Sequence, residues 1–209
     1  MNLEYNYWSF KGVLSSRLCK DIVDYGLQHT SNTALTGQYP RNLEQKPLNQ
    51  QELKKLQKLR HSNISWVEDP WIYNEIQPYI NVANKNAGWN FQWDWSEAIQ
   101  FTHYRLNYHY NWHRDSLTKP YDDSVQKNFV GKIRKLSVTV SLSAPDDYEG
   151  GNLEFNFFHD VKSKPQVCKE VKPQGSIVVF PSFVFHRVTP VTTGTRYSLV
   201  LWQLGNPFK

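Results

Sequence analysis

The sequence predicts an α+β fold in which N-terminal helices buttress a β-structure of the jelly-roll or related barrel type. Residues 1–87 contain segments with helical spacing and helix-capping residues, whereas the chain from residue 88 onward contains short segments of alternating apolar and polar residues. At 209 residues, with no repeat or linker, the chain has a length at which β-rich folds often form one domain. We therefore expect a single domain over residues 1–209, with a mainly helical buttress in 1–87 and a jelly-roll core in 88–209.

The first half of the chain carries the helix signals. Ser15 or Ser16 fits an N-cap, because a serine hydroxyl can accept a hydrogen bond from a free backbone N–H of the first turn. Pro70 fits the first turn of another helix, where its missing N–H is not needed. Residues 50–60 are expected to form a short basic helix, and the polar, turn-rich residues 31–49 a loop.

The second half carries the strand signals. In residues 135–143 apolar and small polar residues alternate without a break, so one face of the strand should lie in a core and the polar face elsewhere. Aromatic residues alternate with polar ones in residues 89–95, which predicts a strand there as well. Further strands are expected at residues 153–158, 176–180 and 195–203, next to turns rich in glycine and proline.

Composition narrows the class of protein. The net charge of +5 is a mild bias, which does not by itself imply a nucleic-acid partner. Basic residues cluster at 54–60 and 127–135, and we expect both clusters to be solvated surface. With 2 cysteines, no recognisable secretory signal and no apolar run long enough for a membrane span, the sequence predicts a reduced, cytoplasmic location.

A histidine and an aspartate stand two residues apart in Asn-Trp-His113-Arg-Asp115, and His186 lies far downstream, after an expected strand and turn. Residues i and i+2 of a strand point to the same side, so His113 and Asp115 can bind one metal ion together. A jelly roll can bring the strand of His186 beside theirs. Two histidines and one carboxylate form the facial triad that binds non-haem Fe(II) and leaves coordination positions open. Alone, a His-x-Asp triplet also arises by chance or from local hydrogen bonding.

Arg196 follows His186 in Gly-Thr-Arg-Tyr-Ser. Its planar guanidinium can bind a carboxylate at two points, and Ser198 on the same strand face can add a hydroxyl group. The pair therefore predicts a seat for a dicarboxylate co-substrate near the metal. In isolation, an arginine on a strand would be interpreted as a surface residue.

A zinc hydrolase is disfavoured as an alternative. His109 and His113 have the His-x-x-x-His spacing that binds zinc on a helix, but their aromatic neighbours favour a strand. In addition, no glutamate follows the first histidine, as metalloprotease chemistry would require.

Several motifs occur in a fixed order between about residue 97 and residue 204. They are Gln100-Phe-Thr-His-Tyr-Arg, His113-Arg-Asp115, Arg134-Lys-Leu-Ser-Val-Thr-Val-Ser-Leu-Ser, Tyr148-Glu-Gly-Gly-Asn-Leu-Glu-Phe155, Gly175-Ser-Ile-Val-Val-Phe-Pro-Ser, and His186 followed by Gly-Thr-Arg196-Tyr. This ordered set resembles the Fe(II)/2-oxoglutarate-dependent dioxygenases, and among them the prolyl 4-hydroxylase-like group that includes the PKHD-type hydroxylases.

The resemblance implies a double-stranded β-helix, or jelly roll, as the core. It implies His113, Asp115 and His186 as iron ligands, and Arg196 as the partner of the distal carboxylate of 2-oxoglutarate. Tyr104 resembles the family tyrosine that hydrogen-bonds the co-substrate. The sequence departs from the family after this tyrosine, because Arg105-Leu106-Asn107 stands where a Pro-Gly turn is usual. Core packing is the alternative role for Tyr104.

The activity that the resemblance implies is that of an oxidoreductase. Fe(II), 2-oxoglutarate and O2 would be used, with ascorbate as reductant, and 2-oxoglutarate would be converted to succinate and CO2 as an unactivated C–H is hydroxylated. A prolyl residue of a peptide or protein is the expected substrate, and a free amino acid or small metabolite is the alternative. The polar loop 116–132 could be a lid over the substrate or a surface loop.

Two other classes of function fit the sequence less well. Nucleic-acid demethylation is disfavoured, because the second arginine and the asparagine that demethylases carry around the co-substrate arginine are absent near Arg196. A non-catalytic jelly-roll binding module is the alternative of another class, although such a module would not need three metal ligands and Arg196 together.

Overall fold

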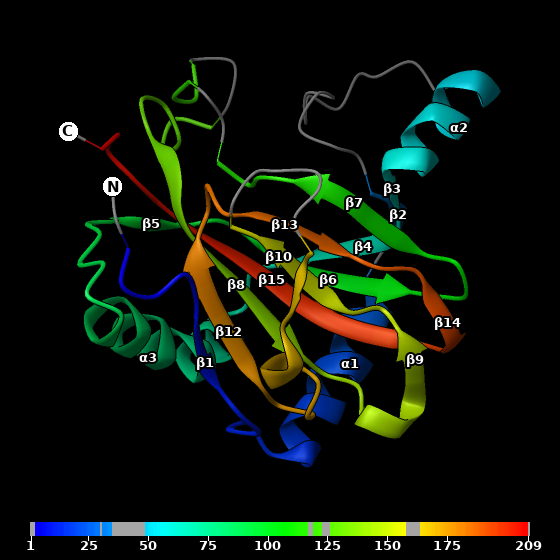
Figure 1. The fold of residues 1–209 in the computed structure, drawn as a ribbon. Helices are drawn as coiled ribbons and strands as arrows, with labels where there is room; N and C mark the ends of the chain where they lie inside the picture. Colours follow the sequence, from blue (N-terminus) through cyan, green and yellow to red (C-terminus); the bar gives the residue numbers. More distant parts are fainter. Residues whose placement is uncertain are drawn as a thin grey trace.

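The protein is described by a computed structural model, which covers residues 3–29, 31–34, 49–116, 119–122, 126–157 and 164–208. Two antiparallel sheets face each other, and helices cover the outer side of the larger one (Figure 1). This is the jelly-roll arrangement that the sequence predicts. Among the described residues, no helix has both the length and the apolar composition needed to cross a membrane.

The larger sheet has the strand order β1-β12-β8-β15-β6-β4-β2, with β5 paired to β15. Its strands are β1 (Trp8–Phe10), β2 (Asn32–Thr33), β4 (Asn63–Val67), β5 (Trp95–Ser96), β6 (Ile99–Tyr104), β8 (Ile133–Ser141), β12 (Ile177–Pro181) and β15 (Arg196–Gly205). The smaller sheet has the order β11-β10-β13-β7-β3. Its strands are β3 (Arg60–His61), β7 (His109–His113), β10 (Leu153–Asn156), β11 (Gln166–Val167) and β13 (Phe185–Val188). A two-stranded ribbon pairs β9 (Tyr148–Gly150) with β14 (Val191–Gly194).

Three helices lie where the sequence predicts them: α1 (Ser16–Gln28), α2 (Gln50–Leu59) and α3 (Pro70–Asn86). Ser15 is the N-cap of α1, and its hydroxyl accepts a hydrogen bond of 3.2 Å from the backbone N–H of Leu18. Pro70 occupies the first turn of α3. Two short 3-10 helices, η1 (Pro145–Asp147) and η2 (Lys169–Val171), complete the regular structure of the described residues.

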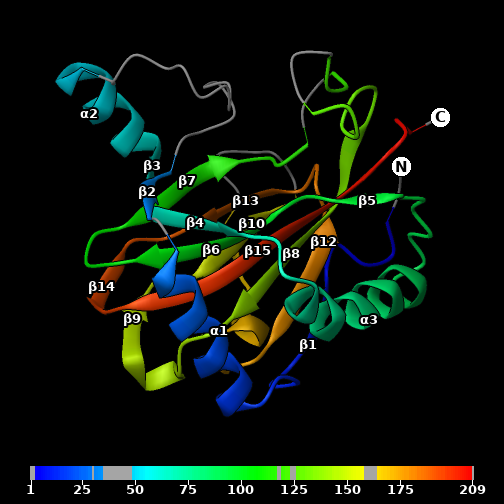
Figure 2. The same ribbon diagram turned by 180° about the vertical axis from the view of Figure 1, so that it is seen from behind.

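The main core lies on the outer face of the larger sheet. Val138 and Val140 of β8 are fully buried there with Ile22 of α1 and Ile76 of α3. Figure 2 shows α1 and α3 in front of this sheet. Burial of these apolar side chains from both layers holds the helices against the sheet.

The polar face of β8 points the other way, toward the space between the two sheets. Ser137, Thr139 and Ser141 are nevertheless buried, with exposed fractions of 0%, 7% and 1%. The alternation in residues 135–143 therefore separates two interiors, one apolar and one polar. A polar interior is unusual for packing alone, and it is the side on which the candidate site lies.

The expected strand over residues 89–95 is wrong, since only its last residue belongs to β5. Phe91 instead exchanges two hydrogen bonds with the side-chain amide of Asn84, at 2.9 and 3.0 Å. Trp89 donates its indole N–H to the backbone carbonyl of Tyr5 at 2.8 Å. Side chains thus replace a neighbouring strand as hydrogen-bond partners, and the aromatic rings pack into the core.

The N-terminal half also contributes strands that the sequence did not predict. Strand β1 pairs with β12 at one edge of the larger sheet, and β4 pairs with β6. The chain passes from β3 in the smaller sheet through Ser62 to β4 in the larger one, and so links the two sheets along one side. Residues 32–33 of the expected loop 31–49 form β2, while residues 35–48 lie outside the described residues.

Candidate active site

The three predicted metal ligands come together between the sheets. Strands β7 and β13 are antiparallel neighbours, and His113 lies directly opposite His186. Asp115 follows two residues after His113, but β7 ends at His113, so strand parity is not what positions the carboxylate. The backbone N–H of Asp115 instead donates to the carbonyl of Ser182 at 2.9 Å, which turns the chain toward the histidines.

The ligand atoms surround a common point. The Nε2 atoms of His113 and His186 lie 3.5 and 3.6 Å from the two carboxylate oxygens of Asp115. One ligand atom from each residue lies within 4.8 Å of the other two. Two imidazole nitrogens and one carboxylate oxygen at this spacing fit a single divalent ion such as Fe(II), with one side of the ion left open.

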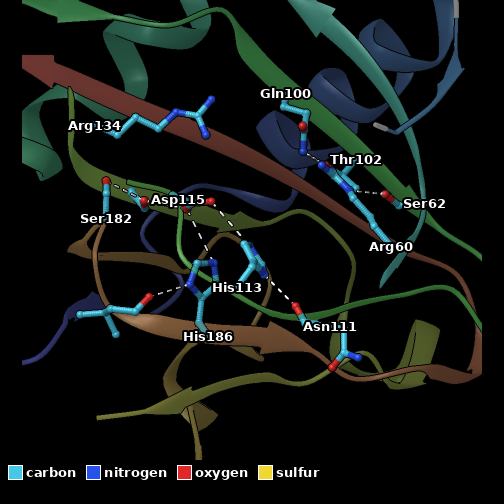
Figure 3. A network of polar contacts seen from close by, with 12 residues as sticks. Arg60, Ser62, Gln100, Thr102, Asn111, His113, Asp115, Arg134, Ser182 and His186 are labelled. Carbon is cyan, nitrogen blue, oxygen red and sulfur yellow. Dashed lines mark hydrogen bonds and ion pairs between the residues drawn. The ribbon is translucent and has the colours of Figure 1, made fainter. Parts of the chain in front are cut away.

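Backbone and hydroxyl groups fix the orientation of each ligand. The Nδ1 atoms of His113 and His186 contact the carbonyls of Asn111 and Val184 at 2.8 and 3.0 Å, which turns both Nε2 atoms toward Asp115. Ser137 of β8 donates to Asp115 at 2.7 Å. Such supporting hydrogen bonds keep metal ligands in position before the ion arrives. Figure 3 shows the triad and several of these contacts.

Electrostatics favour the protonation states that a metal needs. Burial acts to raise the pKa of Asp115, but the nearby His186, His113 and Arg134 outweigh it and hold that pKa well below its usual range. Burial, together with the nearby His113, lowers the pKa of His186 to about 4. At neutral pH the site therefore offers an ionised carboxylate and a neutral imidazole, the forms that bind metal.

Arg196 lies on β15, in the larger sheet, and is 1% exposed. It donates to the hydroxyl of Ser198 at 3.2 Å, and its guanidinium carbon lies 5.2 Å from the ring centre of Tyr104 on β6. Within the described part of the chain, no carboxylate pairs with it. A buried charge without a counter-charge is costly, so this arrangement suits a ligand that brings a carboxylate.

Two further features support a seat for such a ligand. Ser141 lies opposite Ser198 in the register of β8 and β15, and its buried hydroxyl has no hydrogen-bond partner among the described residues. Gly151 has φ +56°, and a Cβ atom added there would lie 2.9 Å from the Cδ of Arg196. Glycine is thus required both by the backbone and by the closeness of the arginine. The residues present fit a bound 2-oxoglutarate.

Sequence reasoning missed several residues of this interior. Ser137 and Ser141 belong to the polar face of residues 135–143. The alternation predicts that this face lies outside the apolar core but does not link it to the site. Tyr110 stacks on His113 with ring centres 3.5 Å apart, and nothing in its spacing marks it. The expectation that both basic clusters are solvated is wrong in part, because Arg60 and Lys135 are 5% and 4% exposed.

Other predictions can be placed as well. His109 lies on a strand, as expected, and its ring contacts the carbonyls of Asn107 and Lys58 rather than the triad. The possible lid 116–132 is described only in part, since residues 117–118 and 123–125 lie outside the described residues.

Comparison with known protein families decides the class. The family model described as the 2OG-Fe(II) oxygenase superfamily matches residues 99–204, which is just over half of the chain. The chain belongs to the 2OG-Fe(II) oxygenase superfamily. The matched region includes the three candidate ligands, Arg196 and Tyr104. The resemblance inferred from the ordered motifs is confirmed.

Curated relatives of this oxygenase match over shorter regions. A PKHD-type hydroxylase of Hyphomonas neptunium is 46% identical over 68 residues, which are 32% of this chain and 27% of the relative. A PKHD-type hydroxylase of Crocosphaera subtropica is 34% identical over 105 residues, which are 50% of this chain and 41% of the relative. The chain thus spans well under half the length of these relatives.

Solved structures extend the likeness to nearly the whole chain. The viral collagen prolyl hydroxylase of Paramecium Bursaria Chlorella virus-1 has a TM-score of 0.64 at 17% identity, with 97% of each chain covered. A prolyl-4-hydroxylase of Pseudomonas putida has a TM-score of 0.60 at 19% identity, with 96% of this chain and 92% of that one covered. At these identities the comparison establishes the shared fold, and the predicted jelly roll is confirmed.

Proposed function

We propose that this superfamily member is an Fe(II)- and 2-oxoglutarate-dependent dioxygenase that hydroxylates an unactivated C–H bond. A prolyl residue of a peptide or protein is its first candidate substrate. The observation that carries the proposal is the pairing of two sites in one interior. One is a His-Asp-His cluster, and the other is a buried arginine without a carboxylate partner among the described residues.

Each site residue has a proposed role. His113, Asp115 and His186 would hold Fe(II), and Ser137 would keep the carboxylate of Asp115 in place. Arg196 would bind the distal carboxylate of 2-oxoglutarate, with Ser198 and Tyr104 beside it. When bound, Fe(II) and 2-oxoglutarate supply the oxidising chemistry: substrate C–H, O2 and 2-oxoglutarate become C–OH, succinate and CO2.

The protein itself contributes binding, orientation and exclusion of water. The side chains of Asp115 and His186 are each 6% exposed, whereas that of His113 is 14% exposed. The open side of the cluster therefore lies toward His113. The ordered hydrogen bonds of the ligands mean that little rearrangement is needed when the ion binds.

The names of the relatives and structural neighbours support a prolyl substrate, because PKHD-type and prolyl hydroxylases recur among them. A free amino acid or small metabolite is the second candidate, favoured by a further buried arginine beside the triad, Arg60. The 2 free, buried cysteines support our proposal of a reducing, cytoplasmic location.

Purified protein incubated with Fe(II), ascorbate and 2-oxoglutarate should form succinate. His113→Ala and Asp115→Ala should abolish that product while circular dichroism shows an intact fold. Mass spectrometry of a proline-rich peptide after the reaction should reveal the mass of one added oxygen atom on proline. Absence of Fe(II) or 2-oxoglutarate binding would reject the enzyme and leave a jelly-roll binding module. Succinate formation without peptide modification would reject only the peptidyl substrate.

A further inference from the structure

Among the buried or half-buried arginines that the structure describes, Arg60 and Arg196 differ from the others because neither pairs with a carboxylate. Arg134 and Arg187 each pair with a glutamate, at 2.5 and 2.7 Å. Arg60 and Arg196 are 5% and 1% exposed, and within the described ranges neither has a carboxylate partner. Arg196 is accounted for by the 2-oxoglutarate seat, but Arg60 is not.

The surroundings of Arg60 are polar and buried. Its Nε donates to the hydroxyl of Ser62 at 3.0 Å. Gln100 and Thr102 of β6, which are 3% and 0% exposed, are joined by a hydrogen bond of 2.9 Å. Figure 3 shows Arg60 beside these three residues, on the His113 side of the triad. A guanidinium placed among neutral polar groups keeps its full charge without compensation.

Packing contacts involve the flat face of the Arg60 guanidinium but not its edge. Its carbon lies 4.5 Å from the ring centre of Tyr110, so the flat face is used in a cation–π contact. The N–H groups point outward in the guanidinium plane, and the terminal nitrogens of Arg60 make no hydrogen bond to any residue that the structure describes. The edge that binds carboxylates at two points is therefore available.

The position of Arg60 places this edge close to the metal cluster. Arg60 lies opposite Tyr110 in the register of β3 and β7. Tyr110 in turn stacks on His113, with ring centres 3.5 Å apart. One aromatic ring therefore separates the guanidinium from a candidate iron ligand. A small molecule anchored at Arg60 would have its carbon skeleton beside the triad.

We propose that Arg60 binds a carboxylate of the substrate, an inference that rests on the proposed dioxygenase function. The substrate is then a free amino acid, or a peptide whose last residue is hydroxylated. An internal prolyl residue lacks the required anion. Arg60 belongs to β3 of the smaller sheet, whereas Arg196, which we assign to the 2-oxoglutarate seat, belongs to β15 of the larger one.

Matched acids and amides test this proposal. The probes are L-proline and glycyl-L-proline, each with its C-terminal amide, titrated calorimetrically into protein loaded with Fe(II) and 2-oxoglutarate in the absence of oxygen. At least one acid should bind wild-type protein about 10- to 100-fold more tightly than its amide, the range of a charge-assisted hydrogen bond. Tighter binding of proline indicates a free amino acid, and tighter binding of the dipeptide indicates a peptide C-terminus.

Arg60→Gln should remove the difference between acid and amide while leaving 2-oxoglutarate affinity unchanged. Arg60→Lys keeps the charge and should retain part of the preference, which separates binding from a folding defect. Arg17→Gln, at an exposed position on α1, is the control and should behave as wild type. Equal or undetectable binding of acid and amide by wild type, or an unchanged preference in Arg60→Gln, overturns the proposal. Loss of 2-oxoglutarate binding in Arg60→Gln would overturn it too, by assigning Arg60 to the co-substrate. Failure of wild type to bind 2-oxoglutarate would instead reject the function on which it rests.

Discussion

Replacing Arg196 by methionine separates a ligand-binding arginine from a structural one. The substitution keeps most of the side-chain volume and removes the charge. Arg196 is 1% exposed and makes one hydrogen bond, to Ser198, so the protein without 2-oxoglutarate loses little when the charge is removed. We expect the free energy of unfolding of this form to stay the same or to rise, because an uncompensated buried charge has been deleted.

The effect on 2-oxoglutarate binding should be large. A buried, charge-assisted pair contributes about 3 kcal/mol, so the Kd should rise roughly 150-fold. At a 2-oxoglutarate concentration of about 100 times the wild-type Kd, ligand binding stabilises wild-type protein by about 2.7 kcal/mol. For Arg196→Met the same concentration should give only about 0.3 kcal/mol.

Denaturant unfolding with and without 2-oxoglutarate, with Fe(II) present and oxygen excluded, measures both quantities. Arg134→Met is the matched contrast, because it removes the ion pair between Arg134 and the buried Glu97 and should destabilise the protein by about 3–5 kcal/mol in either condition. The reasoning is refuted if Arg196→Met is stabilised by 2-oxoglutarate as strongly as wild type. A loss of several kcal/mol in the protein without 2-oxoglutarate would equally refute it.

Three further predictions concern the metal site and its surroundings. Ser137→Ala removes the hydroxyl that donates to Asp115 and should weaken Fe(II) binding about 10-fold or more in equilibrium dialysis, whereas an unchanged affinity would remove Ser137 from the site. Gly151→Ala should cost about 1–2 kcal/mol of stability, because φ +56° strains an alanine. The added Cβ atom would also press on Arg196 and should weaken 2-oxoglutarate binding. Wild-type stability together with wild-type 2-oxoglutarate affinity would count against this packing. The pKa of His186 falls from 6.5 to about 4 on folding, so the unfolded chain binds more protons between these pH values and metal-free protein should lose stability as pH falls from 6.5 to 4. His186→Gln should flatten this part of the curve of stability against pH. An equally steep curve in the variant would argue against His186 as the group responsible.

The sequence predicts the site better than it predicts the parts of the fold that surround it. The structure brings His113, Asp115 and His186 together, as their predicted role as ligands of one metal ion requires. What positions Asp115, however, differs from the prediction. Strand β7 ends at His113, and Asp115 is held by the carbonyl of Ser182 rather than by strand parity.

Failures occur where tertiary contacts decide the outcome. Residues 89–95 alternate as a strand would, yet Asn84 takes up the backbone hydrogen bonds of Phe91 from a different segment. Arg60 stands in a basic cluster that resembles solvated surface, and a strand of two residues has no periodicity from which burial could be inferred. The sequence predicts a polar face for β8, but that face is buried only because the smaller sheet lies opposite it.

Equilibrium binding of Fe(II) and 2-oxoglutarate to the same preparation, without oxygen, tests the central claim most directly. Wild-type protein should bind one Fe(II) ion per chain, and 2-oxoglutarate should bind tightly only when the metal is present. Asp115→Ala should lose Fe(II), and Arg196→Met should keep Fe(II) but bind 2-oxoglutarate weakly. Fe(II) binding that is unchanged in Asp115→Ala, or 2-oxoglutarate binding that does not depend on Arg196, would contradict the assignment of this interior as an iron and 2-oxoglutarate centre.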